Sequence, residues 1–185
     1  MARFAGFVVE NNRQAPSDLI RRMGKALAID PAYRLAEFEE KGMALSVCDP
    51  AIFPDALAEV VWNADHSRCI VLSGEIFDYQ SRKKELIEQG HQFRYSSGSN
   101  AGAEFMLHLY EVMGDDFALE INGSFAAAIY DTQSRELRLV NGRLGVPLLY
   151  YAQHNGRLLF GSSVASLLAD PQLPRAVNTT AIAEL

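Results

Sequence analysis

The sequence predicts an α+β protein in which two mostly antiparallel sheets pack face to face with helices outside them. Two observations predict this class. Short strand-like runs occur in two groups, on either side of two central helical segments, and polar turns typical of hairpins join several of them. The helical segments carry apolar residues on one face only, and a sheet-on-sheet core with helices outside would bury all of these faces.

Composition limits the class of protein further. The 185 residues are 49% hydrophobic, which suffices for one complete core. No apolar run approaches the roughly 18 residues needed to cross a bilayer, and the N-terminus lacks the long apolar stretch of a signal peptide. We therefore expect a cytoplasmic protein without a membrane partner. A net charge of −6 argues against nucleic acid as a partner, because phosphate binding needs clustered Lys and Arg.

The first half of the chain contains one helix and several strands. An apolar run at 4–9 predicts a strand at the very start, so the N-terminus should be built into the core. Between residues 19 and 27 apolar residues recur at helical spacing, with Arg21, Arg22 and Lys25 on the opposite face. Further strands are predicted at 34–39, 43–48, 57–62 and 68–73.

The second half adds two helices and a run of strands. A helix between Tyr79 and Gly90, a strand at 91–95, a Ser/Gly-rich surface loop at 96–102 and a helix over 105–113 are predicted in that order. The loop lacks the Lys and Ser/Thr of a phosphate-binding loop. Strands follow at 125–130, 137–140, 148–152 and 158–160, the last two joined by a tight Asn155-Gly156 turn. The final residues, 181–185, begin a helix without a stop signal, so we expect the chain to be part of a longer protein.

Residue types and spacing alone give no catalytic constellation. Cys48 and Cys69 lie inside apolar runs, which favours buried, reduced thiols over a disulfide or a metal site. The four histidines show no metal-ligand spacing, so no metal ligand set is predicted. No Ser/His/Asp order and no Gly-x-Ser-x-Gly elbow is present.

Seven segments in register carry a resemblance to a known family. These are residues 4–7, Leu45–Asp49, Ser73–Tyr79, Glu104–Gly114, Asn122–Ala126, Arg143–Tyr151 and Gly156–Ser162. They cover nearly the whole chain, which is similar to the N-terminal glutaminase domain (type 2 glutamine amidotransferase) of asparagine synthetases. The resemblance implies a four-layer αββα sandwich of the N-terminal nucleophile (Ntn) hydrolase type.

The resemblance also implies a domain organisation and a partner. Residues 1–178 would form the glutaminase-like domain, and 179–185 would start a linker or helix toward a C-terminal synthetase domain. That domain, in the same or another chain, is the expected partner, and a homodimer is also open. ATP and magnesium are expected only in the synthetase domain, and no cofactor is expected in this chain.

The chain departs from the family at the nucleophile. The family's chemistry requires an N-terminal cysteine, whose thiol attacks the side-chain amide of glutamine after Met1 is removed. Here that position is Ala2, whose methyl group has no lone pair to attack with. No catalytic residue is therefore expected to be intact.

Other pocket positions implied by the resemblance have changed as well. Ala44 stands where an arginine would pair with the substrate carboxylate, and Gly102 stands where an aspartate would hold its ammonium group. Ser73 replaces the asparagine of the oxyanion hole, whereas Gly74, which would lend its backbone N–H, remains. The vestigial pocket is thus expected at Ala2, Ala44, Ser73, Gly74 and Gly102.

Three functions remain open at this level. The first is a degenerate, glutaminase-inactive domain that supports a synthetase domain, as in β-lactam synthetases or lasso-peptide cyclases, which need no ammonia. The second is a module that binds a small neutral ligand in the vestigial pocket. The third is an active glutamine-hydrolysing asparagine synthetase, against which Ala2, Ala44 and Gly102 stand. The loop at 141–148 also departs from the family pattern, at a place that tends to face the synthetase domain.

Overall fold

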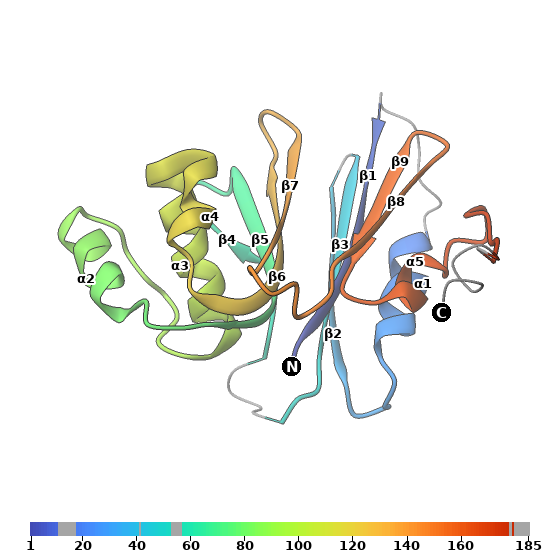
Figure 1. Ribbon diagram of the computed structural model, residues 1–185, viewed down its shortest axis with the longest axis horizontal. Coiled ribbons are helices and arrows are strands. Elements are labelled where there is room, and N and C mark those ends of the chain that lie inside the picture. Colours follow the sequence, from blue (N-terminus) through green and yellow to red (C-terminus); the bar gives the residue numbers. More distant parts are fainter. Residues whose placement is uncertain (11–17, 41, 53–56, 178, 180–185) are drawn as a thin grey trace.

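The computed structural model describes residues 1–10, 18–40, 42–52, 57–177 and 179, and these form two sheets and several helices (Figure 1). The strands are β1 (Arg3–Val9), β2 (Arg34–Glu40), β3 (Met43–Asp49), β4 (Val61–Trp62), β5 (Arg68–Ile76), β6 (Gly123–Asp131), β7 (Glu136–Asn141), β8 (Tyr150–His154) and β9 (Arg157–Gly161). The helices are α1 (Leu19–Leu27), α2 (Gln80–Glu88), α3 (Gly98–Met113), α4 (Phe117–Glu120) and α5 (Val164–Leu167), and a 3₁₀ turn (Gly114–Asp116) links α3 to α4.

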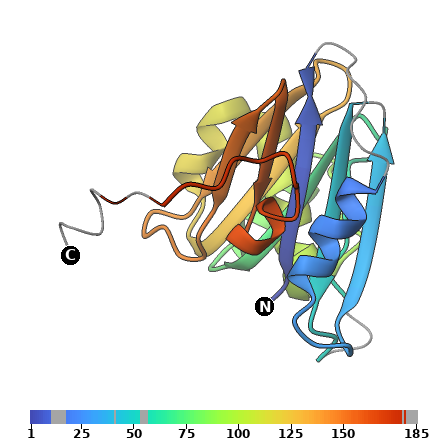
Figure 2. The ribbon, with the colours of Figure 1, turned by 90° about the vertical axis from the view of Figure 1, so that its right-hand side faces the viewer.

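The elements stack in four layers. One sheet has the strand order β2-β3-β1-β9-β8 and the other has the order β4-β5-β6-β7, with antiparallel neighbours throughout. Helices α1 and α5 cover the outer face of the five-stranded sheet, and α1 lies across it in Figure 2. On the other side α3 covers the four-stranded sheet, as Figure 1 shows. The αββα sandwich expected from the sequence is therefore confirmed.

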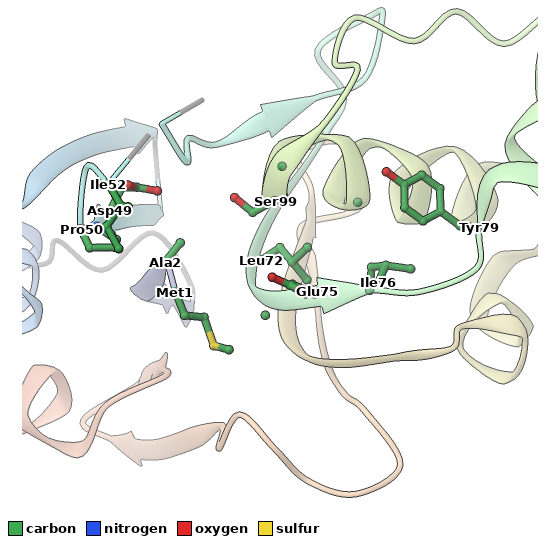
Figure 3. A pocket seen from close by; sticks show the side chains of 13 residues that line it. Met1, Ala2, Asp49, Pro50, Ile52, Leu72, Glu75, Ile76, Tyr79 and Ser99 are labelled. Carbon is green, nitrogen blue, oxygen red and sulfur yellow. The ribbon is translucent and has the colours of Figure 1, made fainter. Parts of the chain in front are cut away.

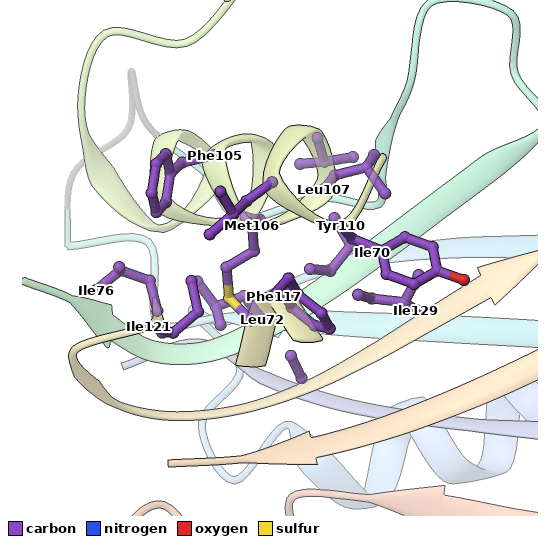
Figure 4. Close-up of a cluster of buried hydrophobic side chains, with 14 of the residues drawn as sticks. Ile70, Leu72, Ile76, Phe105, Met106, Leu107, Tyr110, Phe117, Ile121 and Ile129 are labelled. Atoms are coloured by element: carbon purple, nitrogen blue, oxygen red, sulfur yellow. The ribbon is translucent and has the colours of Figure 1, made fainter. Parts of the chain in front are cut away.

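Buried apolar side chains hold these layers together. Between the sheets Phe4 and Phe160 are fully buried, because strand residues alternate between the two faces of a sheet. Between α3 and its sheet a second cluster contains Met106, Leu109 and Phe117, and part of it is drawn in Figure 4. Each layer contact thus buries one face of a strand or helix that the sequence pattern marks as apolar.

The N-terminal strand lies in the middle of its sheet. Strand β1 pairs with β3 on one side and with β9 on the other. The expectation that the N-terminus is built into the core is confirmed. As a consequence Ala2, the residue just before β1, lies at the end of the sandwich between the two sheets.

Most predicted elements form, including the tight turn that joins β8 to β9. Asn155 and Gly156 both have positive φ, 51° and 69°, as a tight β8–β9 turn requires. The four late strands occur, with β8 displaced to Tyr150–His154 from the predicted 148–152. Most of the predicted linker or helix at 179–185 lies outside the described residues.

Three local predictions are wrong, and all three concern helix α3 or the segments whose backbone its side chains bind. The strand predicted at 91–95 does not form, because the backbone N–H groups of Arg94 and Tyr95 donate to the Glu104 carboxylate at 3.0 Å instead of to a neighbouring strand. The strand predicted at 57–62 keeps only Val61–Trp62, since Asn100 binds the backbone of residues 57 and 59. The predicted loop at 96–102 is helical from Gly98 onward, and this first turn places Asn100.

None of the described helices has the length and apolar composition needed to span a bilayer.

Candidate functional site

A hollow of about 360 Å³ opens at the end of the sandwich where β1 begins (Figure 3). The start of the chain, the residues after β3, strand β5 and the first turns of α3 contribute to it. Its described lining is Met1, Ala2, Asp49, Pro50, Ile52, Leu72, Gly74, Glu75, Ile76, Tyr79, Gly98, Ser99 and Gly102. Three of the five positions predicted from the sequence, Ala2, Gly74 and Gly102, therefore meet here.

Ala2 is held between the two sheets. Its side chain is 6% exposed and belongs to the cluster of apolar residues in the sheet-on-sheet core. Its carbonyl accepts a 2.7 Å hydrogen bond from the hydroxyl of Ser73, which is 2% exposed on β5. This bond joins the start of one sheet to a central strand of the other. The Ser73 hydroxyl thus has a structural partner and does not line the hollow.

Gly74 occupies a position that only glycine fits. Its φ is +115°, a conformation that residues with a Cβ rarely adopt. A Cβ at this site would also lie 2.1 Å from the carbonyl oxygen of Ser124 and 2.7 Å from the Cα of Phe125, on the neighbouring strand β6. Only glycine therefore allows this backbone conformation at position 74, which lines the hollow.

Gly102 sets the distance between α3 and β5. A Cβ added to it would lie 3.2 Å from the Ile76 Cγ1 atom and 3.4 Å from the Leu72 Cδ2 atom. Both are apolar side chains of β5. A larger polar side chain at position 102 would point into this tight apolar contact, so glycine suits the present packing.

Ala44 does not join the site. It is 1% exposed, pairs with Phe7 near the far end of β1, and packs in the apolar layer next to α1. Because β3 runs antiparallel to β1, the last residue of β3, Asp49, comes to the end where Ala2 lies. Ala44 is not among the described residues that line the hollow, whereas Asp49 is.

The charged side chains of the described lining are both acidic. They are Asp49 and Glu75. The Asp49 carboxylate is anchored, because it accepts hydrogen bonds from the backbone N–H groups of Ala51 at 2.7 Å and Ala58 at 3.0 Å. Cysteine, histidine, lysine and arginine are all missing from the described lining.

The two cysteines lie elsewhere and are poor nucleophiles. Both are free and buried, as the sequence predicts. Burial raises the pKa of the Cys69 thiol to about 12 and also raises the pKa of Cys48. Since the thiolate is the reactive form, neither residue can replace the missing nucleophile.

A second group of polar side chains escaped the sequence analysis. His91, His108 and Glu111 meet in another hollow, on the outer side of the four-stranded sheet. A signal was present for two of them, because residues three apart on a helix share one face. The third could not be placed, since residues 91–95 were predicted to form a strand.

Solved structures establish the class of this fold. Glutamine phosphoribosylpyrophosphate amidotransferase from Bacillus subtilis superposes with a TM-score of 0.58 at 13% identity, over 90% of this chain and 37% of that chain. A second structure, described as the allosteric regulatory enzyme of purine biosynthesis, superposes with a TM-score of 0.55. The fold is that of Ntn-type amidotransferases.

Sequence comparison then gives the family. The family model described as "Glutamine amidotransferase domain" matches residues 1–185, and the chain belongs to this family. Asparagine synthetase [glutamine-hydrolyzing] 3 of Bacillus subtilis is 33% identical over 116 residues, 63% of this chain and 18% of the relative. Asparagine synthetase B of Escherichia coli is 28% identical over 116 residues, 62% of this chain and 20% of the relative. The chain thus spans about a fifth of the length of these relatives.

Proposed function

We propose that this domain is a degenerate, glutaminase-inactive amidotransferase that serves as a scaffold for an ATP-dependent, amide-forming synthetase domain in the cytoplasm. One observation carries the proposal: the described lining of the hollow at Ala2 contains no thiol, imidazole or cationic side chain. Covalent transfer of the glutamine amide nitrogen needs a nucleophile and a base that activates it. Ala2 supplies no nucleophile from its side chain.

Binding of glutamine is disfavoured as well. The α-carboxylate of a free amino acid is most strongly held by an arginine, through two parallel charge-assisted hydrogen bonds. The charged side chains that the described lining offers, Asp49 and Glu75, carry the same sign as that carboxylate. These carboxylates could pair with the ammonium group of glutamine, but no charged side chain of the described lining pairs with its carboxylate.

The hydroxyl groups near the hollow do not compensate for Ala2. Ser73 already donates its hydroxyl to the Ala2 carbonyl, and it is buried. Ser99 and Tyr79 line the hollow, but no histidine lies among the described lining residues to take a proton from either one. A hydroxyl is a far weaker nucleophile than a thiolate, and without an imidazole to activate it we expect little covalent catalysis.

The scaffold role is supported by what the domain keeps. Three apolar clusters fill the spaces between its four layers, so the fold is intact although the described lining of the pocket offers no thiol or imidazole. Several relatives are named as glutamine-hydrolyzing asparagine synthetases, and this chain matches only a small part of each. A synthetase that closes an amide with an internal amine, in the manner of β-lactam synthetases or lasso-peptide cyclases, would need the scaffold but no ammonia. ATP and magnesium would then be bound by the partner domain.

Glutamine hydrolysis by the purified chain tests the proposal. We expect wild-type protein and the Ala2→Cys variant both to release glutamate with a kcat far below about 1 s⁻¹, the low end of ordinary enzyme turnover. The Ala2→Cys variant restores the thiol but not a cationic partner for the substrate carboxylate. Bacillus subtilis asparagine synthetase 3, assayed in parallel, is the positive control.

The wild-type and Ala2→Cys proteins distinguish two results that would contradict the proposal. Turnover by the wild-type chain would contradict the loss of glutaminase activity. Turnover by Ala2→Cys alone would show that the remaining pocket still binds glutamine and that only the nucleophile has been lost. Titration of both proteins with glutamine by calorimetry separates binding from chemistry.

A further inference from the structure

The groups that converge at the second hollow are of the types that bind transition metals. The Nδ1 atoms of His91 and His108 are 3.0 Å apart. The Glu111 Oε2 atom lies 3.0 Å from the His108 Nδ1 atom and 3.9 Å from the His91 Nδ1 atom. Zinc bonds of about 2.0–2.1 Å at tetrahedral angles place neighbouring ligand atoms about 3.3 Å apart. The three observed separations bracket this value.

With a neutral His108 ring, the three atoms face one another with more lone pairs than hydrogens. The Nε2 atom of His108 lies 3.1 Å from the carbonyl oxygen of Gln92, which can only accept, so Nε2 carries the proton. In the neutral ring the Nδ1 atom then presents a lone pair. The His91 Nδ1 atom and the Glu111 Oε2 atom each lie 3.0 Å from it, so a neutral His108 gives Glu111 no hydrogen to accept, and only a protonated His108 would donate one. A metal cation, in contrast, accepts all three lone pairs at once.

Neighbouring groups hold the three side chains in place. The Gln92 carbonyl fixes the ring of His108, and the Asn63 side-chain amide donates to the Glu111 Oε1 atom at 2.8 Å. Asn63 is itself held, because its Oδ1 atom accepts from the Arg68 backbone N–H at 3.0 Å. Metal-binding histidines and carboxylates are commonly oriented by partners of this kind.

The charge balance of the hollow also suits a cation. Arg94 lines the same hollow, but its guanidinium is engaged by Glu104 and by the Trp62 carbonyl. It therefore does not neutralise Glu111.

We propose that His91, His108 and Glu111 form a binding site for a divalent transition-metal ion, with Zn²⁺ as the preferred ion. Two imidazoles and one carboxylate suit zinc, whereas magnesium and calcium prefer all-oxygen ligands. The side chains of His91 and Glu111 are each 21% exposed, so the fourth coordination position faces the hollow of about 520 Å³. The ion would tie the segment between α2 and α3 to the C-terminal half of α3.

Metal binding by the untagged full chain tests the proposal. The protein is stripped with a chelator, freed of the chelator, and titrated with Zn²⁺ by calorimetry, and bound metal is counted by mass spectrometry. We expect one Zn²⁺ per chain and a higher melting temperature in its presence. Under the same conditions Mg²⁺ should not bind at this site.

Single substitutions locate the site. His91→Ala and Glu111→Gln should each weaken Zn²⁺ binding by more than about 100-fold, the upper range seen when only a supporting partner of a ligand is lost. His154→Ala, the same deletion on β8 of the other sheet, should leave the affinity unchanged. Circular dichroism without metal checks that each variant is folded. Absence of stoichiometric Zn²⁺ binding, or equal affinity in wild type and folded His91→Ala, would overturn the proposal.

Discussion

Three small residues meet at one end of the sandwich, and each is small for a different reason. Ala2 is buried between the sheets, and its carbonyl holds Ser73. Gly74 has a positive φ and lies against the backbone of β6. Gly102 lets α3 approach the apolar side chains of β5. The packing around the hollow therefore suits small residues at these three positions, in addition to any effect that they have on catalysis.

Substitution of Gly74 measures how rigidly this end of the sandwich is built. We expect Gly74→Ala to lower the free energy of unfolding by about 2–5 kcal/mol, because an unfavourable φ and a backbone clash act together. Gly90→Ala is the matched control: its φ is +99°, but nothing lies within 4 Å of the added Cβ. That variant should lose only about 1–2 kcal/mol. Urea denaturation gives both values, and equal losses would mean that the contact with Ser124 is unimportant.

The resemblance to the family predicted the location of some pocket residues better than that of others. Ala2, Gly74 and Gly102 line the hollow as predicted, and each lies in or beside a segment that carries the resemblance. Ala44 was assigned from the short motif at 45–49, and the strand pairing puts it beside Phe7 instead. A one-dimensional match does not fix how far along a strand the site lies. Antiparallel pairing with β1 shows which end of β3 reaches the hollow, and Asp49 lies at that end.

At the scale of elements, helix α3 organises the segments that precede it. Its buried side chains Asn100 and Glu104 are polar, and each binds backbone groups of a distant segment. Buried polar groups must be hydrogen-bonded, and here the partners are residues 57, 59, 94 and 95. Periodicity predicted strands in those segments, since nothing local reveals that a helix side chain takes their hydrogen bonds. The same rearrangement brings His91 to α3.

The turn between β6 and β7 gives a prediction of pH dependence. Asp131 is 6% exposed; burial alone would raise its pKa, but hydrogen bonds from the Ser134 N–H, Arg68 and the Gln133 N–H outweigh this and lower it. A carboxyl whose pKa is lower in the folded state stabilises the protein above its unfolded pKa of about 3.9. That contribution is lost as the pH falls through the folded pKa.

Asp131→Asn should therefore destabilise the protein in a pH-dependent way. At pH 7 we expect a loss of about 1–3 kcal/mol, because the charge-assisted bond to Arg68 is removed. The difference from wild type should shrink as the pH is lowered below about 4. Asp115→Asn, at an exposed ion pair with Arg138, should change stability by less than about 1 kcal/mol. Unfolding curves between pH 2 and about 7 test this, and a constant difference would contradict the role of the Asp131 charge.

At the scale of the whole molecule, the layers follow from the sequence pattern while the second site does not. Amphipathic helices and alternating strands allow few arrangements that bury every apolar face, and the four-layer sandwich is one of them. The cluster of His91, His108 and Glu111 depends on a loop path that only the folded structure reveals. Fold is thus encoded redundantly by many residues, whereas a site of three side chains is encoded by a few contacts.

Exposed apolar side chains gather around the loop between β7 and β8. The loop between β7 and β8 exposes Leu144 by 91%, Val146 by 58% and Leu148 by 57%, and Tyr151 on β8 is 71% exposed. Beside them an apolar hollow lies between the edge strands β7 and β8. Exposed apolar patches of this kind mark protein interfaces. Since the chain spans about a fifth of its relatives, a synthetase domain is the partner that we propose for this surface.

Charges placed in this loop test the scaffold role without disturbing the fold. Leu144→Asp combined with Leu148→Asp should leave the melting temperature nearly unchanged, because both side chains are exposed. Binding to a synthetase domain, the partner that we propose, should weaken by at least about tenfold, which corresponds to about 1.4 kcal/mol. Ile29→Asp, at a 70% exposed residue beyond α1, is the control and should bind normally. Equal binding by all three proteins would place the partner on another face, and a dimer of the wild type that the double variant abolishes would assign the surface to a second copy of the chain.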